Sequence, residues 1–132
     1  MEKLEYYSLI VRNKPGTGVE ALNALKEAGV GFIALWGYPV GKGKSRIDMV
    51  AQDTALLKQA AKKLKLDLGK KQTAFHFSGE DRPGAVVEVL GRLAAKKINI
   101  SAVQALCADS GRFGALVQVA PEDVRKAAKA LE

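Results

Sequence analysis

Apolar residues in the first half of the chain fall into two spacings, which predict a strand followed by a helix. Residues 5–12 alternate apolar and polar positions, a pattern typical of a half-buried strand. A Pro-Gly pair at positions 15–16 then marks a turn. The residues that follow place Val19, Leu22 and Leu25 along one helical face. We therefore expect a helix over residues 16–29.

The next apolar segments predict a β-hairpin and a second helix. Residues 30–38 and 46–52 are rich in residues that favour strands, and the Lys-Gly-Lys sequence at 42–44 between them is a turn signal. Asp53 stands where a helix would begin, and aspartate is a favoured N-cap residue. The first half is thus predicted to run strand, helix, strand, strand, helix.

The second half of the sequence repeats the first. Residues 7–36 align with residues 75–104 without a gap, and the first Pro-Gly pair falls on a second pair at 83–84. The apolar face of the predicted helix is repeated as well. The repeat predicts strands at 72–79, 98–107 and 112–120, a turn at Asp-Ser-Gly 109–111, and helices at 84–97 and from Pro121 onward.

Two copies of this order predict an α+β protein made of two ferredoxin-like βαββα(β) modules, residues 1–69 and residues 70–132. Each module is expected to have an antiparallel sheet with both helices on one face. Residues 66–68 could supply a short fourth strand in the first module, and the second module has no counterpart. Its sheet edge would then carry unpaired backbone groups, so we expect a homodimer.

Composition indicates a globular chain that holds no metal. Hydrophobic residues make up 48% of the 132 residues and charged residues 27%, a balance that allows a buried core. No apolar run approaches the ~18 residues that span a bilayer, and the N-terminus lacks the form of a signal peptide. One cysteine, Cys107, excludes an internal disulfide, and one histidine, His76, disfavours a metal site. We expect a cytoplasmic protein without a cofactor.

The net charge of +7 raises nucleic acid as a possible partner. Nine basic residues stand against three acidic ones between positions 42 and 71. RNA-recognition modules share the predicted strand order, but they display aromatic side chains on their central strands for base stacking. The corresponding segments here, residues 46–52 and 112–120, hold one aromatic residue, Phe113. We therefore interpret the charge as a solvated surface.

The loop after the first strand of each half resembles a family signature. The Asn-Lys-Pro-Gly sequence at 13–16, followed by a helix and Ala-Gly-Val at 28–30, resembles that of ACT domains. Asp-Arg-Pro-Gly at 81–84, with Lys-Ile-Asn-Ile at 97–100, is the closer match. The resemblance covers almost the whole chain as two modules. It implies a regulatory protein that binds an amino acid or related metabolite at the seam between modules and acts on a partner enzyme.

The chemistry of these loops suits a zwitterion. A helix N-terminus exposes backbone N–H groups and the positive end of the helix dipole, which together favour a carboxylate. Gly16 and Gly84 stand at the predicted helix starts, where the lack of a side chain allows close approach. Asp81 can pair with an ammonium group, and Asn13 can donate or accept. The alternative that Asn13 and Asp81 only cap turns stays open.

The candidate ligand residues form two sets. The stronger set comprises Asp81, Gly84 and Ala85, with Asn99, Val103 and Gln104 nearby. The weaker set comprises Asn13, Gly16 and Thr17, facing Leu35 and Trp36. The first half has Gly31 at the position of Asn99, which departs from the family pattern and leaves the ligand unidentified.

The sequence favours a ligand-binding regulator over an enzyme. Acylphosphatases share the strand order, but their anion-binding motif is absent although Arg12 and Arg82 lie near the expected place. We expect no catalytic residues. Two alternatives remain at this point: a protein–protein assembly module that binds no ligand, and, less favoured, an RNA-binding ferredoxin-like domain.

Overall fold

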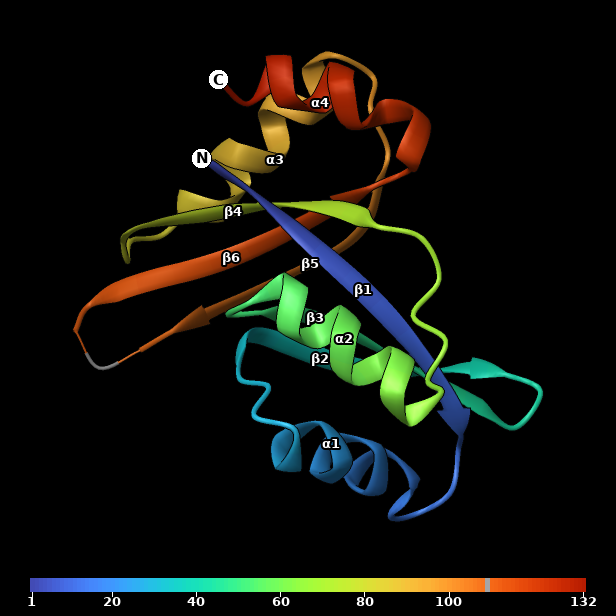
Figure 1. The fold of residues 1–132 in the computed structure, drawn as a ribbon. Helices are drawn as coiled ribbons and strands as arrows, with labels where there is room; N and C mark the ends of the chain where they lie inside the picture. The colour runs from blue at the N-terminus through green and yellow to red at the C-terminus, as the bar shows by residue number, and fades with distance from the viewer. Residues whose placement is uncertain (109) are drawn as a thin grey trace. The chain divides into compact units, whose positions relative to one another are not determined.

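The computed structural model describes residues 1–108 and 110–132 and shows an α+β chain (Figure 1). Asp109, part of the expected turn at 109–111, lies outside the described residues. The described part contains six strands and four α-helices, in the order strand, helix, strand, strand, helix, twice. By contacts it divides into two compact units. Glu5–Gln72 forms what we term the first unit, and Thr73–Glu132 together with Met1–Leu4 forms the second.

The first unit is built on three antiparallel strands. Its elements are β1 (Glu2–Arg12) from Glu5 onward, α1 (Thr17–Glu27), β2 (Phe32–Gly41), β3 (Lys44–Ala51) and α2 (Thr54–Leu64). β3 pairs with both β1 and β2, which gives the order β2-β3-β1. The β2–β3 turn places Lys42 and Gly43 at φ of 55° and 70°. Two consecutive positive φ values are what a tight two-residue hairpin requires.

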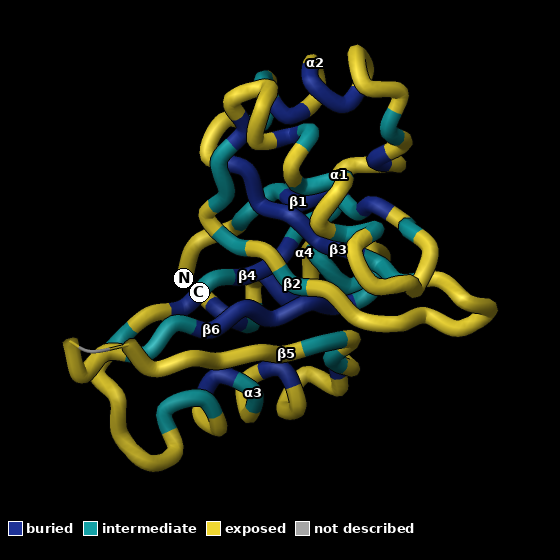
Figure 2. Tube along the Cα trace, turned by 90° about the horizontal axis from the view of Figure 1, so that it is seen from below, coloured by how far each residue is buried: buried dark blue, intermediate teal, exposed yellow. Residues whose placement is uncertain are grey.

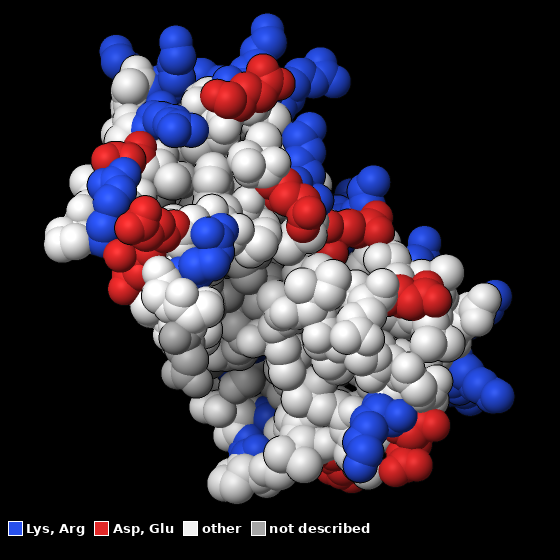
Figure 3. Space-filling model, turned by 90° about the vertical axis from the view of Figure 1, so that its left-hand side faces the viewer, with Lys and Arg blue, Asp and Glu red and all other residues white. Residues whose placement is uncertain are grey.

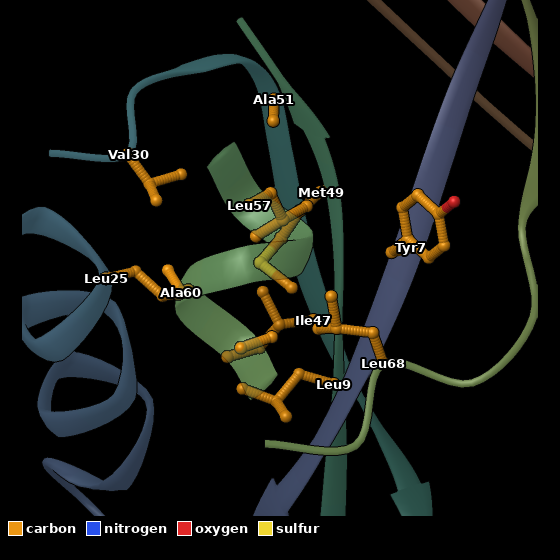
Figure 4. Close-up of a cluster of buried hydrophobic side chains, with 11 residues drawn as sticks. Tyr7, Leu9, Leu25, Val30, Ile47, Met49, Ala51, Leu57, Ala60 and Leu68 are labelled. Atoms are coloured by element: carbon orange, nitrogen blue, oxygen red, sulfur yellow. The ribbon is translucent and has the colours of Figure 1, made fainter. Parts of the chain in front are cut away.

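Both helices of the first unit pack against one face of its strands (Figure 4). Alternate residues of β1 and β3 point to that face, and the helices contribute one buried side of their own. The buried cluster comprises Tyr7, Leu9, Leu25, Val30, Ile47, Met49, Ala51, Leu57, Ala60, Ala61 and Leu68. Asp53 caps α2 as expected, because its carboxylate accepts a hydrogen bond from the Leu56 N–H at 3.1 Å.

The second unit repeats this plan with a second buried cluster. Its elements are β4 (Gln72–Glu80), α3 (Ala85–Ala95), β5 (Ile100–Cys107), β6 (Arg112–Val119), a short 3₁₀ turn η1 (Pro121–Asp123) and α4 (Val124–Ala130). β6 pairs with both β4 and β5. The cluster comprises Phe75, Phe77, Val89, Leu93, Ile98, Ala115, Val117, Val119, Ala127, Ala128 and Leu131. Figure 2 shows β6 mostly buried and β5 mostly exposed.

Some boundaries differ from those expected from the sequence. The helices expected at 16–29 and 84–97 are shorter, Thr17–Glu27 and Ala85–Ala95. Residues 66–68 form no strand; Leu68 instead enters the first unit's core from a loop. Met1–Leu4 groups with the second unit, where the Glu2 carboxylate lies 3.9 Å from Nδ1 of His76. No helix of the described residues is long and apolar enough to cross a membrane.

Candidate functional site

The loop between β1 and α1 is anchored to the tip of the β2–β3 hairpin. The Asn13 N–H donates to the carbonyl of Gly43 at 2.8 Å. The Thr17 hydroxyl donates to the carbonyls of Arg12 and Lys14. Gly16 stands at the N-cap of α1 with φ of 90°, in the left-handed region that favours glycine. The Pro-Gly sequence thus turns the chain so that the helix begins beside the hairpin.

The loop between β4 and α3 is anchored in the same way. The Asp81 N–H donates to the carbonyl of Gly111 at 2.9 Å, as Asn13 does to Gly43. Gly84 occupies the N-cap of α3 with φ of 84°. The Ala85 N–H donates to the Arg82 carbonyl at 3.2 Å, which repeats the bond from Thr17 to Lys14 at 3.3 Å. The internal repeat therefore builds the same backbone frame twice.

Each loop borders a small cavity. The cavity of the first unit, which we term the first loop cavity, has a volume of about 290 Å³. Ser45, one of the residues that line it, donates its hydroxyl to Oδ1 of Asn13 at 2.8 Å. The lining residues are Val11, Arg12, Asn13, Lys14, Thr17, Gly18, Gly37, Tyr38, Pro39, Ser45, Arg46 and Ile47.

The second loop cavity has a volume of about 270 Å³, and most of its lining side chains are apolar. Val87 and Leu106 are exposed at its edge by 70% and 78%, high values for aliphatic side chains. The Cys107 thiol donates to Oδ2 of Asp81 at 3.1 Å. The lining residues are Asp81, Arg82, Gly84, Ala85, Val86, Val87, Ala105, Leu106, Cys107 and Phe113.

Arg46 of the first loop cavity is held by a buried carboxylate. Its Nε donates to Oδ1 of Asp48 at 2.8 Å, and the Tyr38 hydroxyl donates to Oδ2 at 3.0 Å. Burial alone would lower the pKa of the Arg46 guanidinium, but the bond to Asp48 and that carboxylate's charge raise it overall. Burial and the same carboxylate raise the pKa of Tyr38. Arg46 therefore stays cationic and Tyr38 stays neutral at physiological pH.

The ionisable groups of the second loop cavity lie in more open surroundings. Nη2 of Arg82 donates to Glu88 at 2.6 Å, a bond that raises the pKa of Arg82 and lowers that of Glu88. The hydrogen bond to Asp81 raises the pKa of the Cys107 thiol. Cys107 is exposed rather than packed, and its raised pKa leaves little thiolate for nucleophilic chemistry at neutral pH.

Five of the sequence-predicted ligand residues line these cavities. Asn13 and Thr17 line the first, and Asp81, Gly84 and Ala85 line the second. Gly16 belongs to the first loop but does not line its cavity. Glycine at this position serves the turn, since its φ is positive.

The other predicted ligand residues lie away from the loop cavities. Leu35 and Trp36 lie on β2, and Val103 and Gln104 on β5, before the strand residues that reach the cavities. Asn99 precedes β5, whereas Cys107 at the far end of that strand contacts Asp81. Eight strand residues span about 23 Å, so Asn99 and Asp81 do not share a cavity.

Trp36 instead takes part in an aromatic contact. Its ring lies 5.7 Å from that of Tyr6, with the planes inclined at 49°. Its Nε1 is buried and has no hydrogen-bond partner among the described residues.

Sequence reasoning missed the hairpin wall of each cavity. In the first cavity this wall consists of residues 37–39 and 45–47. In the second cavity it consists of residues 105–107 and Phe113. The pairing register of the hairpin could have identified these residues. Once the turn at 42–44 is placed, antiparallel pairing sets Pro39 opposite Ser45, at the end of the hairpin that meets the loop.

A third and larger hollow lies beside α4. It has a volume of about 470 Å³ and is lined by Lys3, Pro121, Val124, Arg125, Ala128, Lys129 and Glu132. Because three of its side chains, Lys3, Arg125 and Lys129, are cationic, this hollow is another candidate site for an anion. Among the described residues, no group of three or more His, Cys, Asp and Glu side chains could hold a metal ion.

Basic and acidic side chains are interleaved on the face shown in Figure 3. Nucleic-acid-binding surfaces gather basic side chains into a continuous patch or stripe. The acidic groups that interrupt the basic ones on this face fit a solvated surface better than a polyanion-binding one.

Comparison with known proteins supports the fold through structure alone. No family model matches the sequence, and no curated protein matches it either. Protein BT0572 from Bacteroides thetaiotaomicron superposes with a TM-score of 0.82 at 19% identity, over 98% of this chain and 86% of that one.

Two regulatory subunits of aspartate kinase have a similar structure. The subunit from Thermus thermophilus, in a ligand-free form, superposes with a TM-score of 0.60 at 14% identity, over 98% of this chain and 90% of that one. The subunit from Thermus flavus gives 0.60 at 14% identity, over 99% and 91%. At these identities the likeness concerns the fold, and it supports the ACT-like fold implied by the sequence resemblance.

Proposed function

We propose that this chain is a regulatory protein that binds a small metabolite, an amino acid in the first instance, at its loop cavities. The observation that carries the proposal is the repeated frame: the same loop, the same hairpin anchor and the same glycine-started helix border a cavity in each unit. Volumes of about 270 and 290 Å³ lie just below the roughly 300–1,000 Å³ of known ligand pockets. A ligand of amino-acid size suits them.

The second loop cavity offers the parts that an apolar amino acid needs. Asp81 supplies a counter-charge for the ammonium group. The N–H groups of Val86 and Val87 lie in the first turn of α3, where backbone N–H groups have no carbonyl partner within the helix. These N–H groups suit the ligand's carboxylate. Leu106 presents apolar surface to the ligand's side chain. Asn13 and Thr17 occupy the corresponding places in the first cavity.

Each half, residues 1–69 and 70–132, would be a ferredoxin-like ACT-type module, and the chain would act on a partner enzyme rather than catalyse a reaction. The likeness to regulatory subunits of aspartate kinase favours this role at the level of fold. A homodimer remains part of the proposal.

The test is a ligand screen followed by a matched pair of variants. A ligand that binds only the folded protein raises its melting temperature, so a thermal-shift screen of the twenty amino acids should identify at least one ligand. In calorimetry, Asp81→Asn should then weaken binding by about 1–3 kcal/mol, the usual contribution of a hydrogen bond to a charged group.

Glu80→Gln is the control for this experiment. Glu80 carries the same charge one residue earlier and does not line the cavity. The proposal expects unchanged affinity in Glu80→Gln. Equal losses in both variants would mean that only the overall charge matters, and no loss in Asp81→Asn would move the ammonium site elsewhere.

An assembly module without a ligand is the second candidate. The observation that favours it is the set of exposed aliphatic side chains on β2 and β5, with Ile33 61%, Leu35 43% and Val103 43% exposed. Failure of all twenty amino acids to shift the melting temperature, together with a stable dimer, would favour this reading.

A further inference from the structure

The two loop cavities share a backbone frame but differ in charge. Three cationic side chains line the first loop cavity, Arg12, Lys14 and Arg46, and the described residues that line it include no acidic side chain. The second loop cavity holds one of each sign, Asp81 and Arg82. The repeat has therefore kept the frame and changed the chemistry inside it.

The difference is sharpest at the position that would meet an ammonium group. Asp81 of the second cavity aligns with Asn13 of the first. A neutral amide supplies no counter-charge, and Oδ1 of Asn13 already accepts a hydrogen bond from Ser45 at 2.8 Å. The amide's remaining polar atom, Nδ2, can only donate. At this position the first cavity therefore lacks a carboxylate that could recognise the ammonium group of an amino acid.

Arg46 is fixed at the wall of the first cavity by two further contacts. Its Nε donates to Asp48 at 2.8 Å and its Nη2 to Oε1 of Gln72 at 2.8 Å. Its side chain is 29% exposed, whereas Asp48 is fully buried and does not line the cavity. Asp48 offsets the charge of Arg46, but Arg12 and Lys14 remain as excess positive charge beside the N-terminus of α1. An oriented guanidinium and a helix N-terminus both favour an anion.

We infer that the first loop cavity binds a small dianion that carries no ammonium group, such as a dicarboxylate or phosphate, while the second binds an amino acid. The inference rests on the proposed function for the second cavity and extends it. A single chain would then respond to two chemically different ligands.

Calorimetry on the full chain at low salt tests this with three ligands: succinate, inorganic phosphate and L-leucine. The expected result is one dianion per chain, taken from succinate, phosphate or both, and no competition with leucine. Whichever dianion binds identifies the ligand chemistry. Its affinity should fall as salt is added, because exposed charge pairs are screened.

Lys14→Gln and Arg82→Gln form a matched pair, since the two residues occupy equivalent positions in the repeat and both are exposed. Lys14→Gln should weaken dianion binding roughly tenfold, the loss of one charged hydrogen bond, and leave leucine binding unchanged. Arg82→Gln should leave dianion binding unchanged. Lys129→Gln, in the hollow beside α4, should also leave it unchanged.

The outcomes separate this inference from the proposed function. Dianion binding that is weakened by Arg82→Gln or Lys129→Gln but not by Lys14→Gln would overturn the inference, because the anion would then lie elsewhere. Leucine binding at two sites per chain with no dianion binding would overturn it while the proposed function stands. Binding of none of the three ligands, with no response to other amino acids, would overturn both.

Discussion

Asp48 is a charged residue in the middle of an apolar strand, and its surroundings explain how it can be there. Strand alternation places it on the face opposite Ile47 and Met49 of the core, yet its side chain is fully buried. Burying an ionised carboxylate is costly unless it is paired and hydrogen-bonded. Ser8 donates to Oδ1 at 2.5 Å, and Arg46 and Tyr38 donate as well. Asp48 thus organises the polar face that leads to the first loop cavity.

Replacing this carboxylate should cost stability. Asp48→Asn keeps the shape and removes the charge opposite Arg46, so we expect the free energy of unfolding to fall by about 1–3 kcal/mol. Urea denaturation measures it. Asp67→Asn is the control, because Asp67 is exposed and bonds only locally, to the Gly69 N–H at 3.0 Å; a change within about 0.5 kcal/mol is expected there. Equal effects in the two variants would contradict the role given to Asp48.

Among the elements, α1 and α3 each begin at a glycine, Gly16 or Gly84, and the shared backbone frame depends on these two residues. Gly84 stands at φ of 84°, and a Cβ added there would meet no atom within 4 Å. The cost of a side chain at this position is therefore one of backbone conformation and not of space. Gly91 offers a contrast, since it lies inside α3, with ordinary φ and open space around it.

The two glycines should respond to alanine with opposite signs. Gly84→Ala should lower the free energy of unfolding by about 1–2 kcal/mol, the cost of a left-handed conformation for an L-residue. Gly91→Ala should raise it by about 0.5–1 kcal/mol, because alanine loses less conformational entropy in a helix. Both are measured by urea denaturation. A neutral Gly84→Ala would show that the loop relaxes to another conformation.

The elements were largely predictable from the sequence, and the cavity walls were not. Apolar spacing and the Pro-Gly repeat located every strand and helix described here to within a few residues. Leu66 and Leu68 misled because an apolar-polar-apolar triplet fits a strand, whereas Leu68 is buried from a loop that follows the left-handed helix cap at Lys65. The hairpin residues beside the loops depend on strand register, which a single sequence specifies only once the turn has been fixed.

At the scale of the whole molecule, the chain is a duplicated frame whose copies have diverged. Within the first unit, the outer strand β2 pairs with one neighbour, β3. Within the second unit, the outer strand β5 pairs with one neighbour, β6. Such strands expose backbone N–H and C=O groups that another chain can pair with. β5 also carries the exposed aliphatic side chains of Val103 and Leu106.

Because β5 exposes both backbone groups and aliphatic side chains, we expect the chain to form a dimer in solution. Light scattering should give a mass near twice the 14.1 kDa of one chain. Val103→Lys should shift the mass toward that of the monomer, because a lysine on the strand opposes pairing. Val103 does not line either loop cavity, so its replacement should not change ligand affinity. A monomer in the wild type at micromolar concentration would exclude the dimer.

An amide NMR titration of the full chain with L-leucine locates the ligand site most directly, because the apolar side chain of leucine suits Val87 and Leu106 of the second loop cavity. The largest shifts are expected at the amides that line the second loop cavity. These are the amides of Asp81, Arg82, Gly84, Ala85, Val86, Val87, Ala105, Leu106 and Cys107. Smaller or no shifts are expected at the amides of Val124, Arg125 and Ala128, which line the hollow beside α4. Shifts confined to that hollow, or no shifts at millimolar leucine, would contradict the assignment of the second loop cavity as the ligand site.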